Sequence, residues 1–201
     1  MHNSEIKNQL INIISERKEF YDCLLNNHKL YLTEKSNEIS NAIYQTHKSN
    51  CKTILCGNGG SHSQSSHLAT ELIIRFKANS NRPPLAAIAI SSDSGVITAG
   101  GNDFGYDEIF SRQLGALLKK DDCLIAFSTS GTSKNILNAI STAKTIIDSS
   151  KIFLITGYKH NIKDESLNLV HCPIKGSTET YQEFHLLLIH MVCNALELIY
   201  A

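Results

Sequence analysis

The sequence lacks an excess of either charge. Its 201 residues carry 19 Lys and Arg against 19 Asp and Glu, so the formal net charge is zero and the pI is about 7.1. Proteins that bind nucleic acid regardless of its sequence usually show a basic excess or a basic stripe. The composition therefore predicts that nucleic acid is not a partner.

Long apolar runs are also lacking. No stretch of about 18 apolar residues occurs, which predicts no membrane-spanning helix and no membrane partner. Residues 1–20 mix charged and apolar side chains and lack the apolar centre of a signal peptide. The sequence therefore predicts a protein that stays on the cytoplasmic side of the membrane.

Closely spaced cysteine pairs are the third absence. The six cysteines form no C-x-x-C pair, and their spacing is irregular. Cys56, Cys123 and Cys172 each lie in or at the end of an apolar, strand-like run. This pattern is typical of reduced, mostly buried thiols in a cytoplasmic protein, and it disfavours a disulfide framework.

Residues 3–50 contain neither proline nor glycine. Apolar residues recur there at helical spacing in two runs, which predicts two amphipathic helices. The residues that carry the pattern are Ile6, Leu10, Ile13, Ile14, Leu24, Leu25, Leu30, Ile39, Ile43 and Tyr44. Helices of this kind need a surface to cover their apolar sides, so we expect them to form a homo-oligomeric bundle.

The rest of the chain alternates between two kinds of segment. Apolar, strand-like runs occupy 52–56, 85–90, 123–128, 151–155 and 167–174, and helical patterns occupy 61–77, 107–118, 133–148 and 178–200. Alternation of this kind predicts an α/β fold with a five-stranded parallel sheet between two layers of helices. The length and the 42% hydrophobic content suit one domain. We expect residues 1–50 to be a helical segment of the same domain as residues 51–201.

Two polar loops directly follow predicted strands. They read GNGGS at 57–61 and STSGTS at 128–133. Because ligands of parallel sheets bind outside the carboxyl ends of the strands, we expect both loops at the same edge. Glycines let a ligand approach the backbone, and hydroxyls at a helix start suit an anion. The simpler alternatives are a tight turn without a ligand in the first loop and N-capping by Thr132 or Ser133 in the second.

The loops also lack the signatures of nucleotide-binding proteins. Neither has the G-K-[ST] of a P-loop or the G-x-G-x-x-G of a dinucleotide fold. A Ser- and Thr-rich loop without lysine suits the phosphate monoester of a small molecule. We therefore expect a small phosphorylated ligand.

A second group of residues suggests chemistry. His67 and Glu71 are four residues apart, so they share one face of a helix. The C-terminal helix adds Gln182 and His190, with Glu183 and His185 between them. Imidazoles, a carboxylate and an amide oxygen together suit a divalent ion such as zinc. A surface His–Glu pair and a hydrogen-bonded core histidine are the simpler alternatives.

The spacing of Gln182 and His190 limits how such a site is built. Eight residues span about 12 Å along a continuous helix, so one ion can hardly reach both side chains from one straight helix. Either Gln182 precedes the helix proper, or the site draws on more than one subunit. The sequence leaves both possibilities open.

Four motifs in order resemble a known family. They are GNGGS followed by H-x-x-x-E-L, GNDFGYDEIFSRQ at 101–113, STSGTS, and QEFH followed by a second histidine. Together, from about residue 30 to 198, they resemble the phosphoheptose isomerases of the sugar isomerase (SIS) family. The resemblance implies an SIS-type three-layer sandwich over residues 51–201 with extra N-terminal helices. It also implies a homotetramer with active sites at subunit interfaces.

The resemblance further implies a reaction and a set of residues. The reaction is isomerisation of sedoheptulose 7-phosphate to D-glycero-D-manno-heptose 7-phosphate through an enediolate, the first step towards bacterial ADP- or GDP-heptose for lipopolysaccharide or capsule. The matching acid/base pair is Glu71 and His190. The ligands of one Zn²⁺ per subunit would be His67, Glu71, Gln182 and His190. Substrate contacts would come from Asn58, Gly59, Gly60, Ser61, Glu71, Asn102, Asp103, Ser128, Thr129, Ser130, Ser133 and Gln182.

Two departures from the family pattern bear on sugar recognition. Gln64 stands where relatives often have an acidic residue, and Thr180 and Tyr181 stand where relatives often have an arginine before Gln182. An isomerase of another sugar phosphate is therefore one alternative. A non-catalytic SIS scaffold that binds a replication initiator is another, and it is disfavoured because the chain keeps the acid/base pair.

Overall fold

The computed structural model describes residues 2–158 and 166–201, and it has the predicted α/β architecture. All strand pairs are parallel, and the order across the sheet is β2-β1-β3-β4-β5. The strands are β1 Thr53–Gly57, β2 Ala87–Ala89, β3 Cys123–Ser128, β4 Ile152–Tyr158 and β5 Asn168–Cys172. The prediction of a five-stranded parallel sheet is confirmed.

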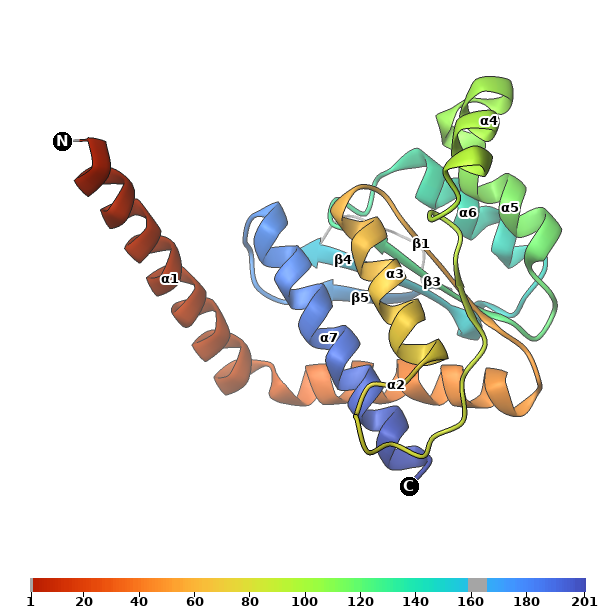
Figure 1. The fold of residues 1–201 in the computed structure, drawn as a ribbon, viewed down its shortest axis with the longest axis horizontal. Helices are drawn as coiled ribbons and strands as arrows, with labels where there is room; N and C mark the ends of the chain where they lie inside the picture. Colours follow the sequence, from red (N-terminus) through yellow and green to blue (C-terminus); the bar gives the residue numbers. More distant parts are fainter. Residues whose placement is uncertain (1, 159–165) are drawn as a thin grey trace.

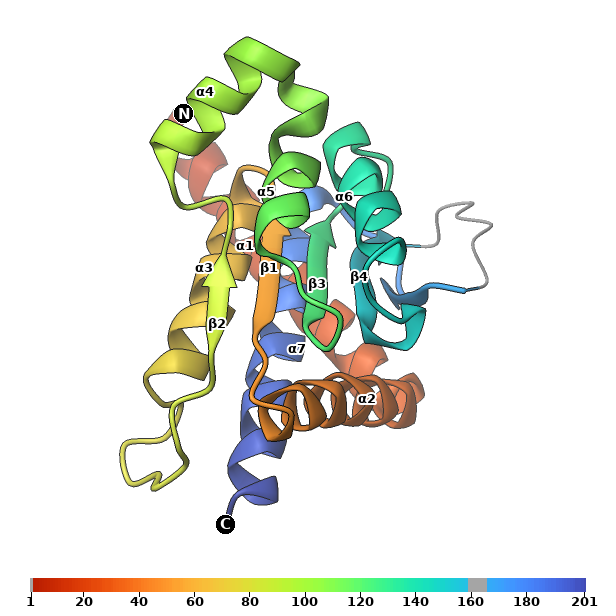
Figure 2. The same cartoon turned by 90° about the vertical axis from the view of Figure 1, so that its right-hand side faces the viewer.

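Helices cover both faces of this sheet. Helices α2, α3 and α7 lie on one face, and α5 and α6 lie on the other (Figures 1 and 2). The helices are α1 His2–Asn27, α2 Lys29–Lys48, α3 Gly60–Ile73, α4 Ser94–Phe104, α5 Ile109–Leu117, α6 Lys134–Lys144 and α7 Thr178–Ile199. Two short 3₁₀ turns, η1 Tyr106–Glu108 and η2 Ser149–Lys151, complete the described chain. Three layers therefore form, as the sequence predicts.

The strands read as unbroken apolar runs because both of their faces are covered. Every residue of β1 and β3 is buried. Successive side chains enter opposite cores. Ile54 and Leu124 pack with α5 and α6, whereas Leu55 and Ile125 pack with α3 and α7.

Helix α4 was not predicted. Its sequence, SGVITAGGNDF, holds three glycines and three β-branched residues, all of them weak helix formers. None of its residues is buried, so no apolar periodicity marks it. Asp93 starts the helix by accepting a hydrogen bond from the backbone N–H of Val96 at 3.0 Å. A side-chain cap, rather than a buried face, signals this helix.

The N-terminal helices behave differently from each other. Helix α2 packs on the sheet face through Ile39 and Ile43, whereas α1 projects away from the body (Figure 1). Phe20 and Leu24 are buried near the end of α1, but Ile14 is 70% exposed. The other apolar residues exposed on α1 are Ile6, Leu10, Ile11, Ile13 and Leu25. Both helices are confirmed, while the oligomeric bundle stays a prediction.

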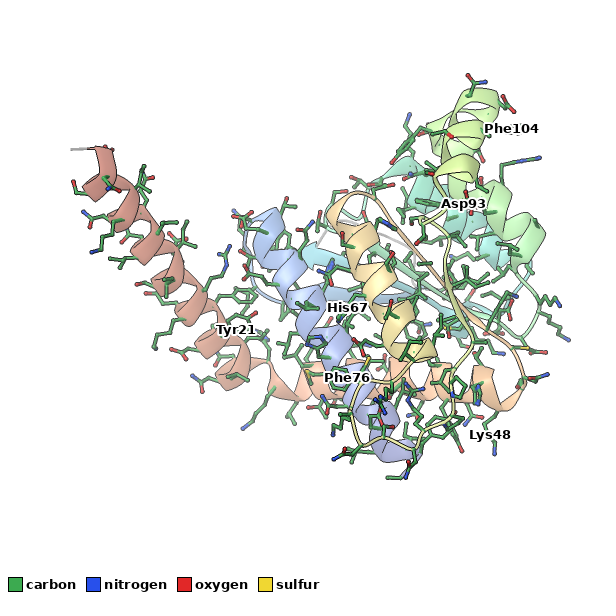
Figure 3. The ribbon with its side chains drawn as sticks, in the orientation of Figure 1. Tyr21, Lys48, His67, Phe76, Asp93 and Phe104 are labelled. Atoms are coloured by element: carbon green, nitrogen blue, oxygen red, sulfur yellow. The ribbon has the colours of Figure 1, made fainter. Side chains whose placement is uncertain are left out.

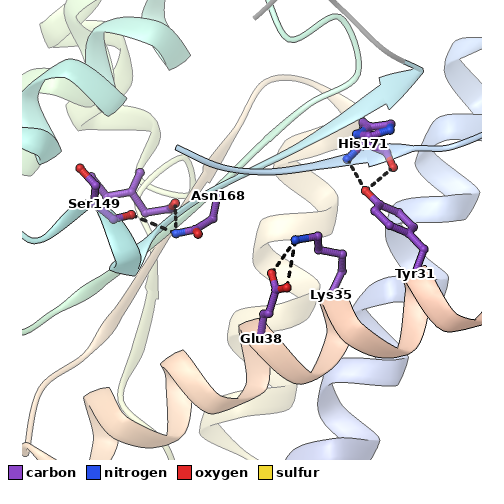
Figure 4. A network of polar contacts seen from close by, with 7 residues as sticks. Tyr31, Lys35, Glu38, Ser149, Asn168 and His171 are labelled. Carbon is purple, nitrogen blue, oxygen red and sulfur yellow. Dashed lines mark hydrogen bonds and ion pairs between the residues drawn. The ribbon is translucent and has the colours of Figure 1, made fainter. Parts of the chain in front are cut away.

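Tyr31 of α2 ties this helix to the edge strand β5 (Figure 4). Its hydroxyl donates to the backbone carbonyl of His171 at 2.9 Å and accepts from the N–H of His171 at 3.0 Å. Burial raises the pKa of Tyr31 to about 12, so the hydroxyl keeps its proton. An edge strand carries backbone groups that no neighbouring strand pairs. Tyr31 satisfies two of them and fixes α2 against the sheet.

The structure also bears on two predictions, that the cysteines are reduced and mostly buried and that no helix spans a membrane. All six cysteines are free, and Cys56, Cys123, Cys172 and Cys193 are buried, as the sequence predicts for most of them. Within the described ranges, no helix is long and apolar enough to cross a bilayer.

Candidate active site

The two polar loops lie at the switch point of the sheet. Strand β1 pairs with β3 so that Gly57 faces Phe127, and the chain leaves β1 towards β2 but leaves β3 towards β4. Ligands bind at such a point, where neighbouring loops diverge to opposite sides. The prediction that both loops share one sheet edge is confirmed.

An amide pair connects the two loops. The side chains of Asn58 and Asn135 exchange two hydrogen bonds, each 2.9 Å long. Asn58 belongs to the GNGGS loop, and Asn135 lies in the first turn of α6, just after STSGTS. The hydroxyl of Tyr106 also donates to the side-chain oxygen of Asn58 at 3.0 Å. The two loops are therefore held in a fixed relation.

The glycines of the first loop have separate structural reasons. Gly59 has a φ of 51°, which side chains disfavour. A Cβ on Gly57 would lie 2.5 Å from the carbonyl oxygen of Ser61, so α3 could not start so close to β1. A Cβ on Gly60 would lie 2.1 Å from the amide nitrogen of Gln182, whose side chain lies against the loop. The loop thus allows both the turn and the close approach of α7.

The second loop gathers three serine hydroxyls at the start of α6. The Oγ of Ser128 lies 3.5 Å from that of Ser130 and 3.4 Å from that of Ser133. Gly131, with a φ of 66°, donates its N–H to the Oγ of Ser128 at 3.1 Å. Ser133 occupies the N-cap position but makes no capping hydrogen bond with its side chain. The hydroxyls therefore cluster at the positive end of a helix, an arrangement that favours an anion over simple N-capping.

The histidines meet where α3 and α7 run side by side. His67 Nε2 lies 3.0 Å from His190 Nε2, and Glu71 Oε1 lies 3.8 Å from His67 Nε2. Figure 3 places His67 between the two helices. Burial lowers the pKa of His190, the neighbouring His67 lowers it further, and Glu71 acts in the opposite direction. Three predicted functional residues thus converge on one place.

Gln182, a predicted zinc ligand, lies away from the pair of histidines. It lies inside α7, so the possibility that it precedes the helix is wrong. Its side chain rests against Gly60, roughly 12 Å along α7 from His190. Within one subunit, Gln182 therefore packs against the GNGGS loop. A glutamine would reach the histidines only if the site were shared between subunits.

The histidine pair has the chemistry of a zinc site but not a complete one. Two imidazole nitrogens on tetrahedral zinc lie about 3.3 Å apart, close to the 3.0 Å seen here. Throughout residues 2–158 and 166–201, however, no three His, Cys, Asp or Glu side chains are arranged to hold a metal ion. The types of donor fit zinc, and the set of donors in one subunit is too small.

Asn102 and Asp103 lie on the exposed helix α4. The side-chain amide of Asn102 donates to the carboxylate of Asp103 at 2.8 Å. Asp103 faces a cavity of about 350 Å³ between α4 and α5. The same segment reaches the GNGGS loop through Tyr106 instead. Contact of Asn102 and Asp103 with substrate stays a prediction.

Similarity to known proteins identifies the family of this chain. The SIS domain family matches residues 19–146. A phosphoheptose isomerase of Chlorobaculum parvum is 40% identical over 155 residues, which cover 77% of this chain and 74% of that protein. A phosphoheptose isomerase of Helicobacter pylori strain P12 is 37% identical over 166 residues, which cover 83% and 84% of the two chains. This chain belongs to the phosphoheptose isomerase family.

Solved structures agree with this assignment. The phosphoheptose isomerase of Francisella tularensis superposes with a TM-score of 0.79 at 27% identity, covering 98% of this chain and 99% of that one. The phosphoheptose isomerase GmhA of Neisseria gonorrhoeae gives 0.73 at 28% identity, covering 98% of both chains. The predicted SIS fold and family are confirmed.

Two further residues that hold the site together are not predicted by the sequence. Tyr106 and Asn135 hold Asn58, and Tyr106 also lines a cavity of about 140 Å³ beside Gly59. Tyr106 lies in the GNDFGYDEIFSRQ motif, in which the family resemblance points only to Asn102 and Asp103 as substrate contacts. Asn135 had a signal too, since it is a polar residue in the first turn of a helix that follows the anion loop.

The two departures from the family pattern lie beside Gln182. The side-chain amide of Gln64 donates to the backbone carbonyl of Gln182 at 3.4 Å. Thr180 is buried, and its hydroxyl lies 2.9 Å from that of Ser177. Both residues therefore shape the end of the site that faces the GNGGS loop.

Proposed function

We propose that this chain isomerises sedoheptulose 7-phosphate to D-glycero-D-manno-heptose 7-phosphate. The observation that carries the proposal is the convergence of His67 and Glu71, on the helix α3 that starts at the GNGGS loop, with His190 of α7. Relatives that are 37–40% identical and bear the name phosphoheptose isomerase support the same reaction.

The reaction moves protons between two carbons and two oxygens. Glu71 takes the proton from C1 of the ketose and returns one to C2, as a general base and then a general acid. His190 carries a proton between the two oxygens. Burial and the neighbouring His67 lower the pKa of His190, which favours the neutral ring that such a proton transfer needs. An enediolate links the two halves of the reaction.

The loops hold the sugar phosphate for these residues. Ser128, Ser130 and Ser133, with the N-terminus of α6, receive the phosphate. Asn58, kept in place by Asn135, faces the sugar hydroxyls from the neighbouring loop. The phosphate fixes one end of the substrate, and the carbonyl end is left to α3 and α7.

Zinc is part of the proposal. His67 and His190 would hold one Zn²⁺ per subunit, Glu71 would join them by turning its carboxylate, now 3.8 Å from His67 Nε2, towards the ion, and a glutamine equivalent to Gln182 would come from another subunit. When bound, the ion would stabilise negative charge on the substrate oxygens as a Lewis acid. The short distance between the imidazole nitrogens and the separation of Gln182 from His190 support such a shared site.

The assembly and the setting are proposed on similar grounds. The exposed apolar residues of α1 support a homotetramer in which this helix is covered by other subunits. Six free cysteines support a reducing, cytoplasmic setting. The product would feed bacterial surface heptose, in lipopolysaccharide or capsule.

The first experiment follows sedoheptulose 7-phosphate in D₂O by proton NMR, with metal-free protein and with added zinc. We expect an aldose signal with deuterium at C2, and a faster reaction with zinc. Metal analysis should find one zinc per subunit. If the sugar phosphate bound but no aldose formed in either sample, the proposed reaction would be wrong, and a scaffold or another substrate would explain the fold.

The phosphate loop gives a prediction about binding. The Ser130→Ala variant should raise KM for the sugar phosphate about tenfold and leave kcat within twofold, because one hydrogen bond to a charged group is lost far from the reacting carbons. Steady-state kinetics measures both constants. Ser141→Ala, at an exposed site on α6, is the matched control and should leave both unchanged. An unchanged KM for Ser130→Ala would show that the phosphate lies elsewhere.

A further inference from the structure

A buried ion pair joins the segment that follows α3 to the last turns of α7. The guanidinium Nε of Arg82 lies 3.4 Å from Glu197 Oε1. The side chains are only 2% and 7% exposed. Arg82 lies in the segment between α3 and β2, and Glu197 lies in the last turns of α7, seven residues after His190.

The guanidinium also holds the end of α3. Its Nη2 donates to the backbone carbonyl of Glu71 at 2.7 Å, and its Nη1 donates to that of Leu72 at 3.0 Å. The last carbonyls of a helix have no partner within the helix, and a cationic side chain can satisfy them. Arg82 therefore binds the backbone of Glu71, the residue proposed to transfer the carbon-bound proton.

Glu197 makes the matching contact from the other helix. Its Oε1 accepts the backbone N–H of Phe76 at 3.3 Å, just beyond the end of α3. The ring of Phe76 lies 5.4 Å from the imidazole of His190, centroid to centroid. One ion pair thus connects the Glu71 backbone, the Phe76 backbone and α7.

Stability alone is a weak reason for such a pair. Two charges taken out of water lose their hydration, and their attraction roughly offsets that loss. Replacing both partners by apolar side chains of similar size is often neutral for stability. A fixed fork of donors, in contrast, sets direction as well as distance.

We propose that Arg82 and Glu197 are positioning residues that set the spacing of α3 and α7 and thereby bring Glu71 and His67 to His190. Neither residue touches the histidines. They act through the Glu71 carbonyl, the Phe76 backbone and the pairing of the two helices. The inference rests on the proposed function for its kinetic test but not for its structural test.

The kinetic test compares two double variants. Arg82→Met with Glu197→Met removes the pair, and kcat should fall about 10- to 100-fold with KM within twofold, because small misplacements of reacting groups are costly. Lys52→Met with Asp122→Met removes another ion pair, at the amino ends of β1 and β3, in which the Asp122 side chain is 1% exposed and the Lys52 side chain is 19% exposed. This control should keep kcat within twofold. Equal kcat values in the two double variants would overturn the proposal.

A milder variant and a structural readout complete the test. Arg82→Lys keeps the charge but lacks the fork that reaches both carbonyls, so kcat should fall about three- to tenfold. A full wild-type kcat in this variant would overturn the role of the fork. In crystal structures, the His67–His190 Nε2 distance should lengthen by about 0.5 Å or more in the Arg82/Glu197 variant and stay constant in the control. An unchanged distance would overturn the proposal. This readout does not depend on activity, so it applies even if neither the wild type nor any variant converts the sugar phosphate.

Discussion

Replacing Glu71 by Gln should lower kcat about a thousandfold while KM stays within threefold. The amide keeps the shape of the side chain but cannot take the proton from C1, and general acid–base catalysis of this kind contributes about 10²- to 10⁴-fold. Steady-state kinetics with sedoheptulose 7-phosphate measures the change. Glu34→Gln, the same substitution at an exposed site on α2, should leave both constants unchanged.

The proposed zinc ligation by Glu71 requires a second measurement on the same variant. We expect Glu71→Gln to stay inactive in excess zinc and to lose deuterium exchange at C1 of the sugar in D₂O. Both results would follow if the carboxylate itself moves the carbon-bound proton. Recovery of turnover in excess zinc would show that Glu71 is only a ligand and that another group is the base.

The sheet and its loops could be predicted because local patterns encode them. A parallel strand covered on both faces, such as β3, must be apolar throughout, and its length is visible in the sequence. The positions of the two loops then follow from topology, since parallel strands carry their carboxyl ends to one edge. Helix α4 escaped because no buried face imposes a period on its sequence.

The details of the site depend on packing between distant segments. His67 and His190 are 123 residues apart, and their approach follows from the packing of α3 against α7 over the sheet. Arg82 showed no pattern at all, because a lone arginine in a loop looks the same whether it faces solvent or caps a helix. Its role is visible only from the carbonyls that it reaches.

The two histidines on α7 differ in burial although both have apolar neighbours in the sequence. His190, between Ile189 and Met191, is only partly buried, whereas His185 is fully buried beside the rings of Phe127 and Phe184. Burial lowers the pKa of His185 to about 4, against a smaller opposing contribution from the backbone of Thr156. This histidine therefore couples folding to pH.

The stability of the metal-free protein should fall as the pH drops from 7.5 to 5, and His185 should account for about 2 kcal/mol of that fall. The unfolded imidazole binds a proton below about pH 6.5, while the folded one stays neutral until about pH 4. The unfolded state binds more protons across this window, so acid favours unfolding. The loss levels off below pH 4, where both states are protonated.

A matched pair of variants isolates this contribution. His185→Leu removes the titrating ring from the core, so its unfolding free energy should lose about 2 kcal/mol less than that of the wild type between pH 7.5 and 5. Phe184→Leu changes an adjacent core residue without a titrating group and should lower stability by the same amount at both pH values. Urea unfolding at one protein concentration, with a chelator present, measures all three proteins. A wild type that lost no more stability than His185→Leu would show that His185 is protonated in the folded protein, which its dry, aromatic surroundings oppose.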